Sequence, residues 1–572
     1  MYRGVSRFGK ALSNHKLRRR LLPETFSMES EVQRPLAHFP VNIWEDILTW
    51  FSNSDLASDT LKEKHSTLKE TVKESFIASR ANPIENIKFI DTLCRLGVSY
   101  NFEKDITQQL EKSFDSLDFN QKIRQDGCDF YTVGIVFQVF RQFGFKLSAD
   151  VFNKFKDEDG KFKTHLAADA RGTLSLYEAA QWSTPGEDTL DEALAFSKAQ
   201  LEEISSRSSP HLAIRIENAQ KHPFHKGISR IETRQYISYY EAEEKCDETL
   251  LEYAKIDFSL LQMLHRQELS CVTSWHKEME FESKITYTKH RVTEAYLWAL
   301  GTYFEPEYSQ ARVTLASVVI LLTALDDMYD AYGTGDELEL FTYALEKWLP
   351  EAPKGIPDSM KHLYRVTIDF YDKLEEELEM QGKSGCGSHF KKSLKSTANG
   401  YMQEAKWLRK DYTAKFDEYK ENAILSSAYY TMMAMTFAGM GDFTKLDAFE
   451  WLSSHPKIRV ASEIICRFTN DITSYEFEHK REHVATGIDC YMKQFCVSKE
   501  RAVQVITNIV SNAWKDLNQE LMRPHSFRFP FLIRILNLSR VIDLFYRYTD
   551  AYTNPEFLKE HIVSLLIENI PN

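Results

Sequence analysis

The chain has 572 residues and a formal net charge of −13, which argues against a protein that binds the phosphate backbone of nucleic acid. The length is too great for one compact core, so we expect two domains. Only 21 Gly and 16 Pro occur, and residues with high helix propensity dominate, so we expect an all-α fold.

Hydropathy and cysteine spacing narrow the class of protein further. No apolar run reaches the roughly 18–20 residues that span a bilayer, so we expect no membrane span. The eight cysteines stand far apart and form no CxxC pair. This spacing favours reduced thiols in an intracellular protein over a disulfide framework or a zinc site.

The first 27 residues form a basic leader. They carry seven Lys or Arg side chains and a single acidic residue, Glu24. An Arg-rich, acid-poor start is typical of an organellar transit peptide, and the alternative is a disordered leader with Met28 as the start. We expect a cytoplasmic protein, or a plastid or mitochondrial one if residues 1–27 act as a transit peptide. In neither case do these residues belong to the fold.

Residues 28–240 are expected to form an N-terminal helical domain. Amphipathic helical patterns alternate there with polar turns such as Asn82-Pro83 and residues 157–160. A charged stretch at 239–248 marks the junction, and the helical patterns lengthen beyond it. We place the boundary near residue 240, which gives a second helical domain over residues 241–572.

An apolar helical run at 313–325 ends abruptly in the carboxylates of Asp326, Asp327 and Asp330. Residues four apart share one face of a helix, so Asp326 and Asp330 can point at the same spot, while Asp327 lies about 100° round the axis. Gly333 and Gly335 are expected to end this helix. Converging carboxylates suit Mg²⁺ or Mn²⁺, and a solvated acidic helix end is the alternative.

A second helix carries an oxygen-rich stripe beside its apolar face. Asn470, Ser474 and Glu478 follow one another at intervals of four, so an amide oxygen, a hydroxyl and a carboxylate line up over two turns. All three groups are ligands that Mg²⁺ accepts. A wet helix surface is the alternative for this stripe alone. Two such stripes in one chain favour a site that holds Mg²⁺ together with substrate phosphates.

These two motifs resemble those of class I terpene synthases. The sequence DDMYD at 326–330 is similar to their DDxxD motif, and NDITSYEFE at 470–478 is similar to their (N/D)Dxx(S/T)xxxE motif. The resemblance to the plant enzymes extends from about Arg34 to the C-terminus. Arg34, Pro35 and Trp44 look like the RRx8W signature with Pro in place of the second Arg, a variant commoner among sesquiterpene synthases. The finer resemblance is to the caryophyllene/humulene type.

The resemblance implies that the protein ionises a prenyl diphosphate with three Mg²⁺ ions, for which Mn²⁺ can substitute. The residues expected to bind metal are Asp326, Asp330, Asn470, Ser474 and Glu478. The residues expected to bind the diphosphate are Lys289, Arg291, Asp326, Asp330, Arg467 and Asn470. Lys289 departs from the RxR motif of the family, because a point charge replaces a bidentate guanidinium. Asp327 is expected to pair with a basic residue when the site closes, and Asp471 to act behind the ligands.

The carbocation left by ionisation needs a pocket of aromatic faces, which stabilise cations. By the same resemblance, Trp298 is expected at the bottom of this pocket and Tyr552 near its mouth. Asp550 is expected beside Tyr552 in a lid loop between the last helices. Residues 426–430 resemble a helix break whose carbonyls face the cation, with Ala428 where Gly is frequent. Ordinary core packing is the alternative for Trp298 and Tyr552.

We therefore expect a monomeric, Mg²⁺-dependent sesquiterpene synthase that converts farnesyl diphosphate to sesquiterpene hydrocarbons and diphosphate. The resemblance implies a class I catalytic bundle preceded by a barrel-like helical domain that lacks the DxDD motif of protonation-initiated cyclases. A monoterpene synthase acting on geranyl diphosphate is one alternative, and a chain-elongating prenyltransferase is a weaker one. From a different class, the alternative is an inactive helical interaction protein.

Overall fold

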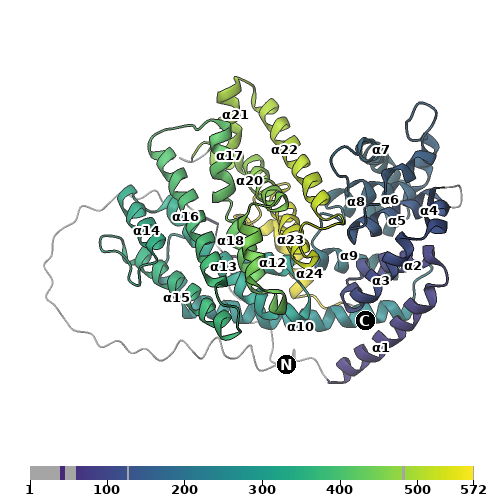
Figure 1. Cartoon of the computed structure of the whole chain (residues 1–572), viewed down its shortest axis with the longest axis horizontal. Coiled ribbons are helices and arrows are strands. Elements are labelled where there is room, and N and C mark those ends of the chain that lie inside the picture. Colours follow the sequence, from purple (N-terminus) through teal and green to yellow (C-terminus); the bar gives the residue numbers. More distant parts are fainter. Residues whose placement is uncertain (1–38, 41, 45–58, 125–127, 480–483, 571–572) are drawn as a thin grey trace.

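The described part of the chain is built of helices (Figure 1). The computed structural model describes residues 39–40, 42–44, 59–124, 128–479 and 484–570. Within these residues the one contact of β type is an isolated bridge between Lys156 and Phe162. The prediction of an all-α fold is confirmed. The basic leader and the Arg34-Pro35 pair lie outside the described residues.

Short helices make up the first part of the chain. Their bounds are α1 (Asp59–Ser79), α2 (Pro83–Arg95), α3 (Glu103–Phe114), α4 (Leu117–Arg124), α5 (Phe130–Gln142), α6 (Ala170–Ala180), α7 (Asp188–Ser205), α8 (Pro210–Lys221) and α9 (Ser229–Glu241), with 3-10 turns η3 (Ser99–Phe102), η4 (Ala149–Phe155) and η5 (Thr164–Ala168). The predicted Asn82-Pro83 turn starts α2, because the Asn82 side chain accepts a hydrogen bond from Ile84 N at 3.2 Å and Pro83 fits the first turn.

Longer helices follow in the second part of the chain. Their bounds are α10 (Glu248–Glu278), α11 (Phe281–Lys284), α12 (Val292–Thr302), α13 (Ser309–Ala331), α14 (Gly335–Lys347), α15 (Asp358–Met380), α16 (Cys386–Arg409), α17 (Phe416–Ser426), α18 (Tyr429–Ala438), α19 (Leu446–Ser453), α20 (Lys457–Glu478), α21 (Gly487–Phe495), α22 (Lys499–Glu520), α23 (Phe529–Tyr546) and α24 (Lys559–Leu566), with 3-10 turns η6 (Pro306–Tyr308), η7 (Gly441–Phe443) and η8 (Pro555–Leu558). The apolar run at 313–325 lies in α13, which is buried along nearly its whole length.

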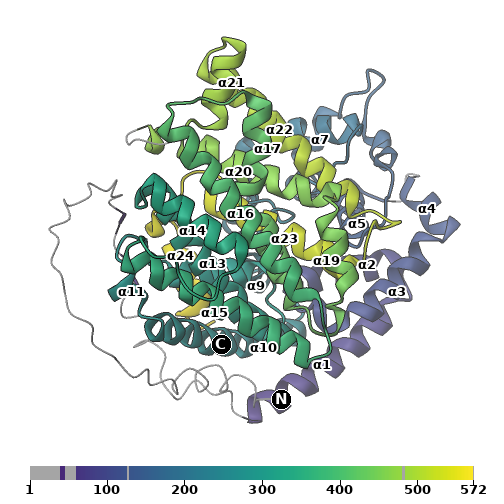
Figure 2. The same cartoon turned by 60° about the vertical axis from the view of Figure 1, so that its left-hand side comes forward.

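The two parts lie side by side, and α10 runs beneath both of them (Figures 1 and 2). The boundary predicted near residue 240 falls at the end of α9, and Asp247 caps the next helix by accepting a hydrogen bond from Leu250 N at 3.0 Å. Helix α10 packs against α1 of the first part and against α12 and α13 of the second. Residues 242–247, most of them exposed, connect α9 to α10, and the two parts share this one long helix as a base.

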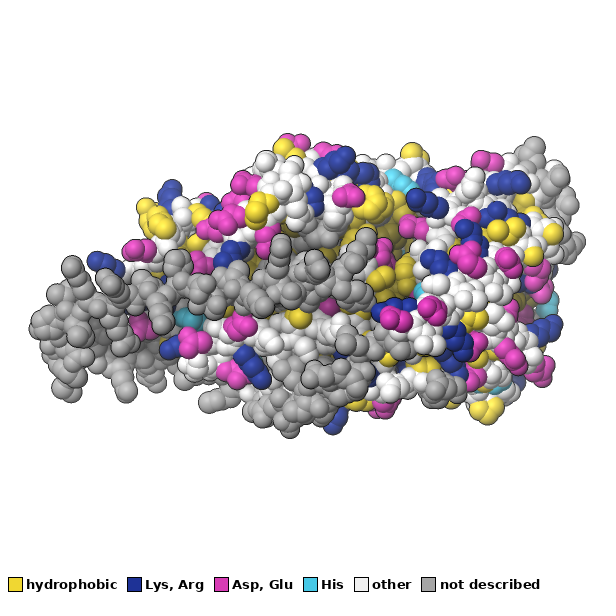
Figure 3. All heavy atoms as spheres, turned by 90° about the horizontal axis from the view of Figure 1, so that it is seen from below, with side chains coloured by type: hydrophobic (Ala, Val, Ile, Leu, Met, Phe, Trp, Pro, Cys, Tyr) yellow, Lys and Arg dark blue, Asp and Glu magenta, His cyan; other side chains and the backbone are white. Residues whose placement is uncertain are grey.

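The surface carries charges of both signs. On the part of the face in Figure 3 that described residues form, acidic and basic side chains are interspersed and no continuous basic surface is present. Together with the net charge of −13, this means that the described part of that face has no basic surface to which nucleic acid would bind. None of the helices in the described ranges is long and apolar enough to cross a membrane.

Candidate active site

A cavity of about 190 Å³ lies among α12, α13, α16, α18, α20 and the loop that follows α23. Ten of the predicted site residues line it: Lys289, Trp298, Asp326, Asp327, Asp330, Arg467, Asn470, Ser474, Asp550 and Tyr552. The fold thus brings three distant segments of the sequence to one space. Arg291 is not among the lining residues. The backbone of Glu478 ends α20, but its side chain lies outside the description.

The carboxyl end of α13 opens into this cavity. Asp326 and Asp330 line it one helical turn apart, on the same side of the helix. Asp327 is 2% exposed and accepts hydrogen bonds from the Thr288 hydroxyl at 2.6 Å and the Lys289 backbone N–H at 3.0 Å. It also accepts one from the Lys289 ammonium at 2.6 Å. Asp327 therefore holds the segment before α12 against the end of α13.

Lys289 lines the cavity with its charge already engaged by Asp327. Its ammonium also lies 4.6 Å from the centre of the Phe39 ring. Burial alone would lower the pKa of Lys289, but the carboxylates of Asp327 and Asp326 outweigh burial and raise it. Lys289 is thus a fixed positive charge at the mouth, and its contact with a diphosphate remains a prediction.

Negative charge exceeds positive charge around the cavity. The acidic lining residues are Asp326, Asp327, Asp330, Glu404 and Asp550, and the basic ones are Lys289 and Arg467. Burial, followed by repulsion from Asp330, raises the pKa of Asp326 to about 8 in the metal-free protein. Among the described lining residues the carboxylates outnumber the cations, and hard oxygen ligands of this kind suit a divalent cation.

The oxygen-rich stripe of α20 forms the wall of the cavity opposite α13. Asn470 and Ser474 line it, and the Ser474 hydroxyl donates to the Asn470 carbonyl at 2.9 Å. Asp471 turns away and accepts hydrogen bonds from the Tyr419 hydroxyl at 2.8 Å and Gly487 N at 3.1 Å. The Arg467 guanidinium, which also lines the cavity, lies 3.0 Å from Asp471. Asp471 therefore holds the Arg467 guanidinium in place from the side away from the cavity.

Arg291 does not line the cavity in this structure, and its binding to a diphosphate stays a prediction. Its guanidinium donates to the carbonyls of Tyr552 at 3.1 Å, Thr553 at 2.9 Å and Pro40 at 2.7 Å, and the residue is 2% exposed. These three acceptors turn it away from the cavity. In this structure Arg291 joins the loop after α23 to the N-terminal segment, and the Trp44 indole secures that segment by donating to Glu294 at 2.7 Å.

Aromatic rings close the apolar end of the cavity. The Trp298 ring lies 4.7 Å from that of Phe545 in a tilted arrangement and meets Tyr552 edge-on at 5.6 Å, with Tyr429 and Tyr546 also near it. The Tyr552 hydroxyl is within 2.6 Å of the Thr323 hydroxyl on α13. Trp298 and Tyr552 therefore line the cavity and also belong to the hydrophobic core, and their contact with a carbocation stays a prediction.

The helix break expected at 426–430 separates α17 from α18. Ala428 adopts φ 60° and ψ 0°, the left-handed region in which a residue with a Cβ is strained. Ser427 and Ala428 line the cavity at this point. A Cβ on Gly400 would lie 2.8 Å from Ser426 N, so this glycine allows α16 to approach the break closely.

Sequence reasoning missed several lining residues, namely Phe39, Thr323, Tyr401, Glu404 and Tyr546. Glu404 on α16 is the most consequential, because its carboxylate accepts a hydrogen bond from the Ser426 hydroxyl at 2.7 Å and lies 3.5 Å from Arg467. The one signal in the sequence that could have identified Glu404 was a carboxylate on the apolar face of a helical pattern. In the structure Glu404 is 5% exposed.

The donors around the cavity fit a hard divalent cation. Most of them are carboxylate, amide and hydroxyl oxygens, and no imidazole is among the described lining residues. Cys466 also lines the cavity, but burial raises the pKa of its thiol, so it offers no thiolate. No three His, Cys, Asp or Glu side chains within the described ranges form a metal cage unaided.

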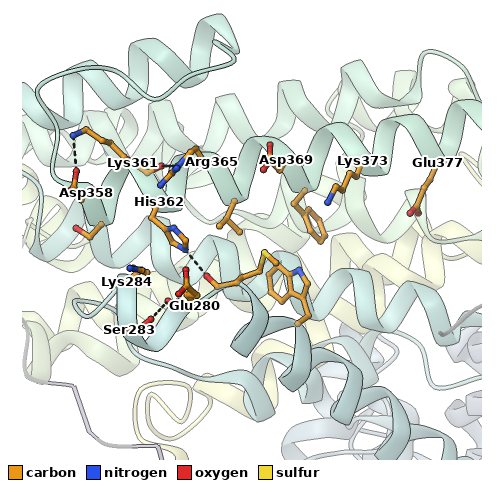
Figure 4. A pocket seen from close by; sticks show the side chains of 15 residues that line it. Glu280, Ser283, Lys284, Asp358, Lys361, His362, Arg365, Asp369, Lys373 and Glu377 are labelled. Carbon is orange, nitrogen blue, oxygen red and sulfur yellow. Dashed lines mark hydrogen bonds and ion pairs between the residues drawn. The ribbon is translucent and has the colours of Figure 1, made fainter. Parts of the chain in front are cut away.

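A larger hollow, of about 870 Å³, lies between α15 and the segment around the end of α10 and α11 (Figure 4). Charges of both signs line it, and some are paired within it, such as Lys361 with Asp358 at 3.0 Å. His362 bonds to the Met279 carbonyl at 2.7 Å. None of the predicted site residues lines this hollow. Its balanced charges give it no counterpart to the acidic excess of the first cavity.

Fold and site together define an all-helical enzyme that uses a divalent metal. The model of the terpene synthase N-terminal domain matches residues 43–219, and that of the terpene synthase family metal binding domain matches residues 277–516. This chain belongs to the terpene synthase family, whose members act on prenyl diphosphates with the help of divalent metal ions.

Individual relatives and solved structures agree with this membership. The chain is 77% identical over 546 residues to an alpha-humulene/(-)-(E)-beta-caryophyllene synthase of Arabidopsis thaliana, covering 95% of this chain and 100% of the relative. It is 43% identical to a probable terpene synthase of Ricinus communis, over 95% of this chain and 100% of the relative. The isoprene synthase of grey poplar superposes with a TM-score of 0.84 at 30% identity, over 90% of this chain and 98% of that one. A limonene synthase superposes with a TM-score of 0.87 at 25% identity, over 94% and 100%.

Proposed function

We propose that this protein is a sesquiterpene synthase that converts farnesyl diphosphate to one or more sesquiterpene hydrocarbons and releases diphosphate. The observation that carries the proposal is one cavity with two unlike ends. Oxygen ligands and an acidic excess form one end, and the aromatic faces around Trp298 form the other. A substrate with a diphosphate head and a hydrocarbon tail matches both ends. The 77% identity to a humulene/caryophyllene synthase supports the fifteen-carbon chain length.

Three Mg²⁺ ions are proposed as the cofactor, with Mn²⁺ able to substitute. A grey poplar isoprene synthase structure holds three Mg²⁺ ions with a thiolodiphosphate, which supports this number. Asp326 and Asp330 would hold two ions, and Asn470, Ser474 and Glu478 the third. When bound, such ions neutralise the charge of the leaving diphosphate.

The side chains of the protein have separate tasks in this proposal. Arg467, held by Asp471, is positioned to bind diphosphate oxygens. Lys289 adds a second positive charge at the mouth, and Asp327 fixes its position. The rings of Trp298 and Tyr552 offer π faces to the carbocation, which favours its folding over capture by water.

The experiment is a comparison of substrates. Purified protein is incubated with Mg²⁺ and geranyl, farnesyl or geranylgeranyl diphosphate, and the volatile products are identified by gas chromatography–mass spectrometry. We expect sesquiterpene hydrocarbons from farnesyl diphosphate and no product in excess EDTA. A preference for geranyl diphosphate would favour the monoterpene synthase, and no product from any substrate would favour the inactive interaction protein.

Two further properties belong to the proposal. We propose a monomer, which light scattering after size-exclusion chromatography tests. We also propose a cytoplasmic location, and fusion of residues 1–27 to a fluorescent protein tests it. Import of that fusion into plastids or mitochondria would identify the leader as a transit peptide.

A further inference from the structure

The loop at residues 547–554, between α23 and η8, has two cavity-lining faces. On one face, Asp550, Tyr552 and Thr553 line the active-site cavity. On the other, Tyr548 and Thr549, together with Ala551, line a second cavity of about 260 Å³. That cavity is walled by residues of the segment from α8 to α9 as well as by the second part of the chain. Any displacement of the loop therefore changes both spaces at once.

The inner face of the loop is held by the second part of the chain. Arg291 donates to the carbonyls of Tyr552 and Thr553 at 3.1 and 2.9 Å. The Tyr552 hydroxyl meets that of Thr323 at 2.6 Å. Within the loop, Thr553 N donates to Asp550 at 2.9 Å. These bonds fix the loop from the side that faces the cavity.

The outer face is held by the end of α8 and the residue that follows it, in the first part of the chain. The Tyr548 hydroxyl donates to the Lys221 carbonyl at 3.1 Å. His222 Nδ1 lies 3.1 Å from the carboxylate of Asp543 on α23, and Arg547, the first residue of the loop, donates to that same carboxylate at 2.8 Å, so His222 reaches the loop through Asp543. Burial alone would raise the pKa of Asp543, but His222 and Arg547 outweigh burial and lower it, so the carboxylate is ionised. An ionised carboxylate only accepts, so His222 Nδ1 donates.

We propose that His222 and Tyr548 are positioning residues through which the N-terminal domain holds this loop over the active site from behind. The inference rests on the proposed sesquiterpene synthase activity. A carbocation that meets water forms a C–O bond, and the bound water then loses a proton to give an alcohol. Without water, the carbocation loses a proton from carbon and gives an alkene. The position of the loop thus decides how much of the product is alcohol.

Because Tyr548 is exposed, substituting it can test its role in positioning the loop with little effect on the stability of the fold. Its side chain is 66% exposed, so its hydroxyl contributes little to core packing. Tyr548→Phe removes the donor to Lys221 and the acceptor for Arg547 Nε at 3.1 Å, an exposed bond that water can replace, but keeps the ring, which meets His222 edge-on at 6.0 Å. His222→Ala removes the bond to Asp543, whereas His222→Asn keeps an N–H donor near the position of Nδ1.

The test measures product ratio and loop protection in Tyr548→Phe, His222→Ala, His222→Asn and a matched control, Tyr412→Phe. Tyr412 is 43% exposed and donates to Glu418 at 2.8 Å, and neither cavity is lined by it. In the first two variants we expect the alcohol share and KM for farnesyl diphosphate to rise about twofold to tenfold, the factor set by the net loss of one hydrogen bond. We expect His222→Asn and Tyr412→Phe to match the native protein.

Hydrogen–deuterium exchange of residues 547–554 supplies a readout that does not depend on turnover. The exchange rate should rise about twofold to tenfold in Tyr548→Phe and His222→Ala, because each loses one hydrogen bond net. In the other two variants it should equal the rate in the native protein. Unchanged exchange and an unchanged product ratio would overturn the inference. Equal behaviour of His222→Ala and His222→Asn would overturn the part assigned to His222. An inactive native protein with increased loop exchange in the variants would instead overturn the proposed sesquiterpene synthase function.

Discussion

The two ends of α13 both carry buried charge, but only one of them opens into a cavity. Near its start, Arg312 is fully buried and donates to both carboxylate oxygens of Glu268, at 2.7 and 2.8 Å. The remaining nitrogen of the guanidinium donates to the carbonyls of Tyr303 and Glu305 at 3.2 and 2.7 Å. At the other end, Asp326 and Asp330 face an acidic cavity, and burial, followed by repulsion from Asp330, raises the pKa of Asp326.

The difference shows what distinguishes a structural charge cluster from a ligand site. At the Arg312 end the guanidinium and the Glu268 carboxylate pair with each other, and both are almost fully buried. At the aspartate end the described carboxylates that line the cavity outnumber the lining cations, and open space lies beside them. Burial of a carboxylate is therefore common to both ends, whereas an excess of carboxylates beside a cavity belongs to the aspartate end.

The largest expected effect is on stability, at the compensated end. Glu268→Ala leaves the buried Arg312 guanidinium without its carboxylate, so we expect the free energy of unfolding to fall by about 3–5 kcal/mol in urea denaturation. Glu252→Ala on the same helix, α10, is the control. Its exposed pair with Lys64 is worth at most about 1 kcal/mol. Equal losses in the two variants would show that the Arg312 pair is not a structural centre.

The next effect is on catalysis, at the aspartate end of α13. Asp326→Asn keeps the shape of the side chain but removes a metal-binding charge, so we expect kcat/KM to fall about 100-fold or more. Stability should not fall with it, because the substitution also removes a buried repulsion. Asp336→Asn, at an exposed acid in the first turn of α14, is the control and should stay active. Retained activity in Asp326→Asn would refute the proposed metal site.

Much of α13 could be predicted from the sequence, because its signals are local. The apolar run, the four-residue spacing of Asp326 and Asp330, and the glycines beyond them predicted a buried helix with an acidic open end. What could not be predicted depends on packing between distant segments. Periodicity places Glu404 on the buried face of α16, but the approach of α16 to the helix break, allowed by Gly400, determines which cavity it lines. The three carbonyls around Arg291 come from three loops and leave no pattern in sequence.

A pH series on the metal-free protein sharpens the comparison. In the folded state the pKa of Asp326 is about 8, whereas the unfolded chain releases this proton near the ordinary aspartate pKa of 3.8. Between these values the folded state binds more protons than the unfolded state, so stability falls as pH rises, by at most about 1.4 kcal/mol per pH unit for one proton. Thermal unfolding in EDTA at a series of pH values measures this fall in stability, and Asp326→Asn should flatten the slope of stability against pH. A slope that persists in Asp326→Asn would assign it to another group.

The smallest effect on stability is expected at the helix break between α17 and α18, where the strained residue Ala428 lines the same cavity. Ala428→Gly relieves a left-handed conformation that costs about 1–2 kcal/mol, but it also removes a buried methyl group and adds chain entropy to the unfolded state. We therefore expect the free energy of unfolding to stay within about 0.5 kcal/mol of native, since these contributions nearly cancel. Ala434→Gly, in the middle of α18, has the same losses without the relief and should cost about 1–2 kcal/mol. Equal costs in the two variants would mean that Ala428 is not strained, and the break would then owe its shape to the packing of α16 alone.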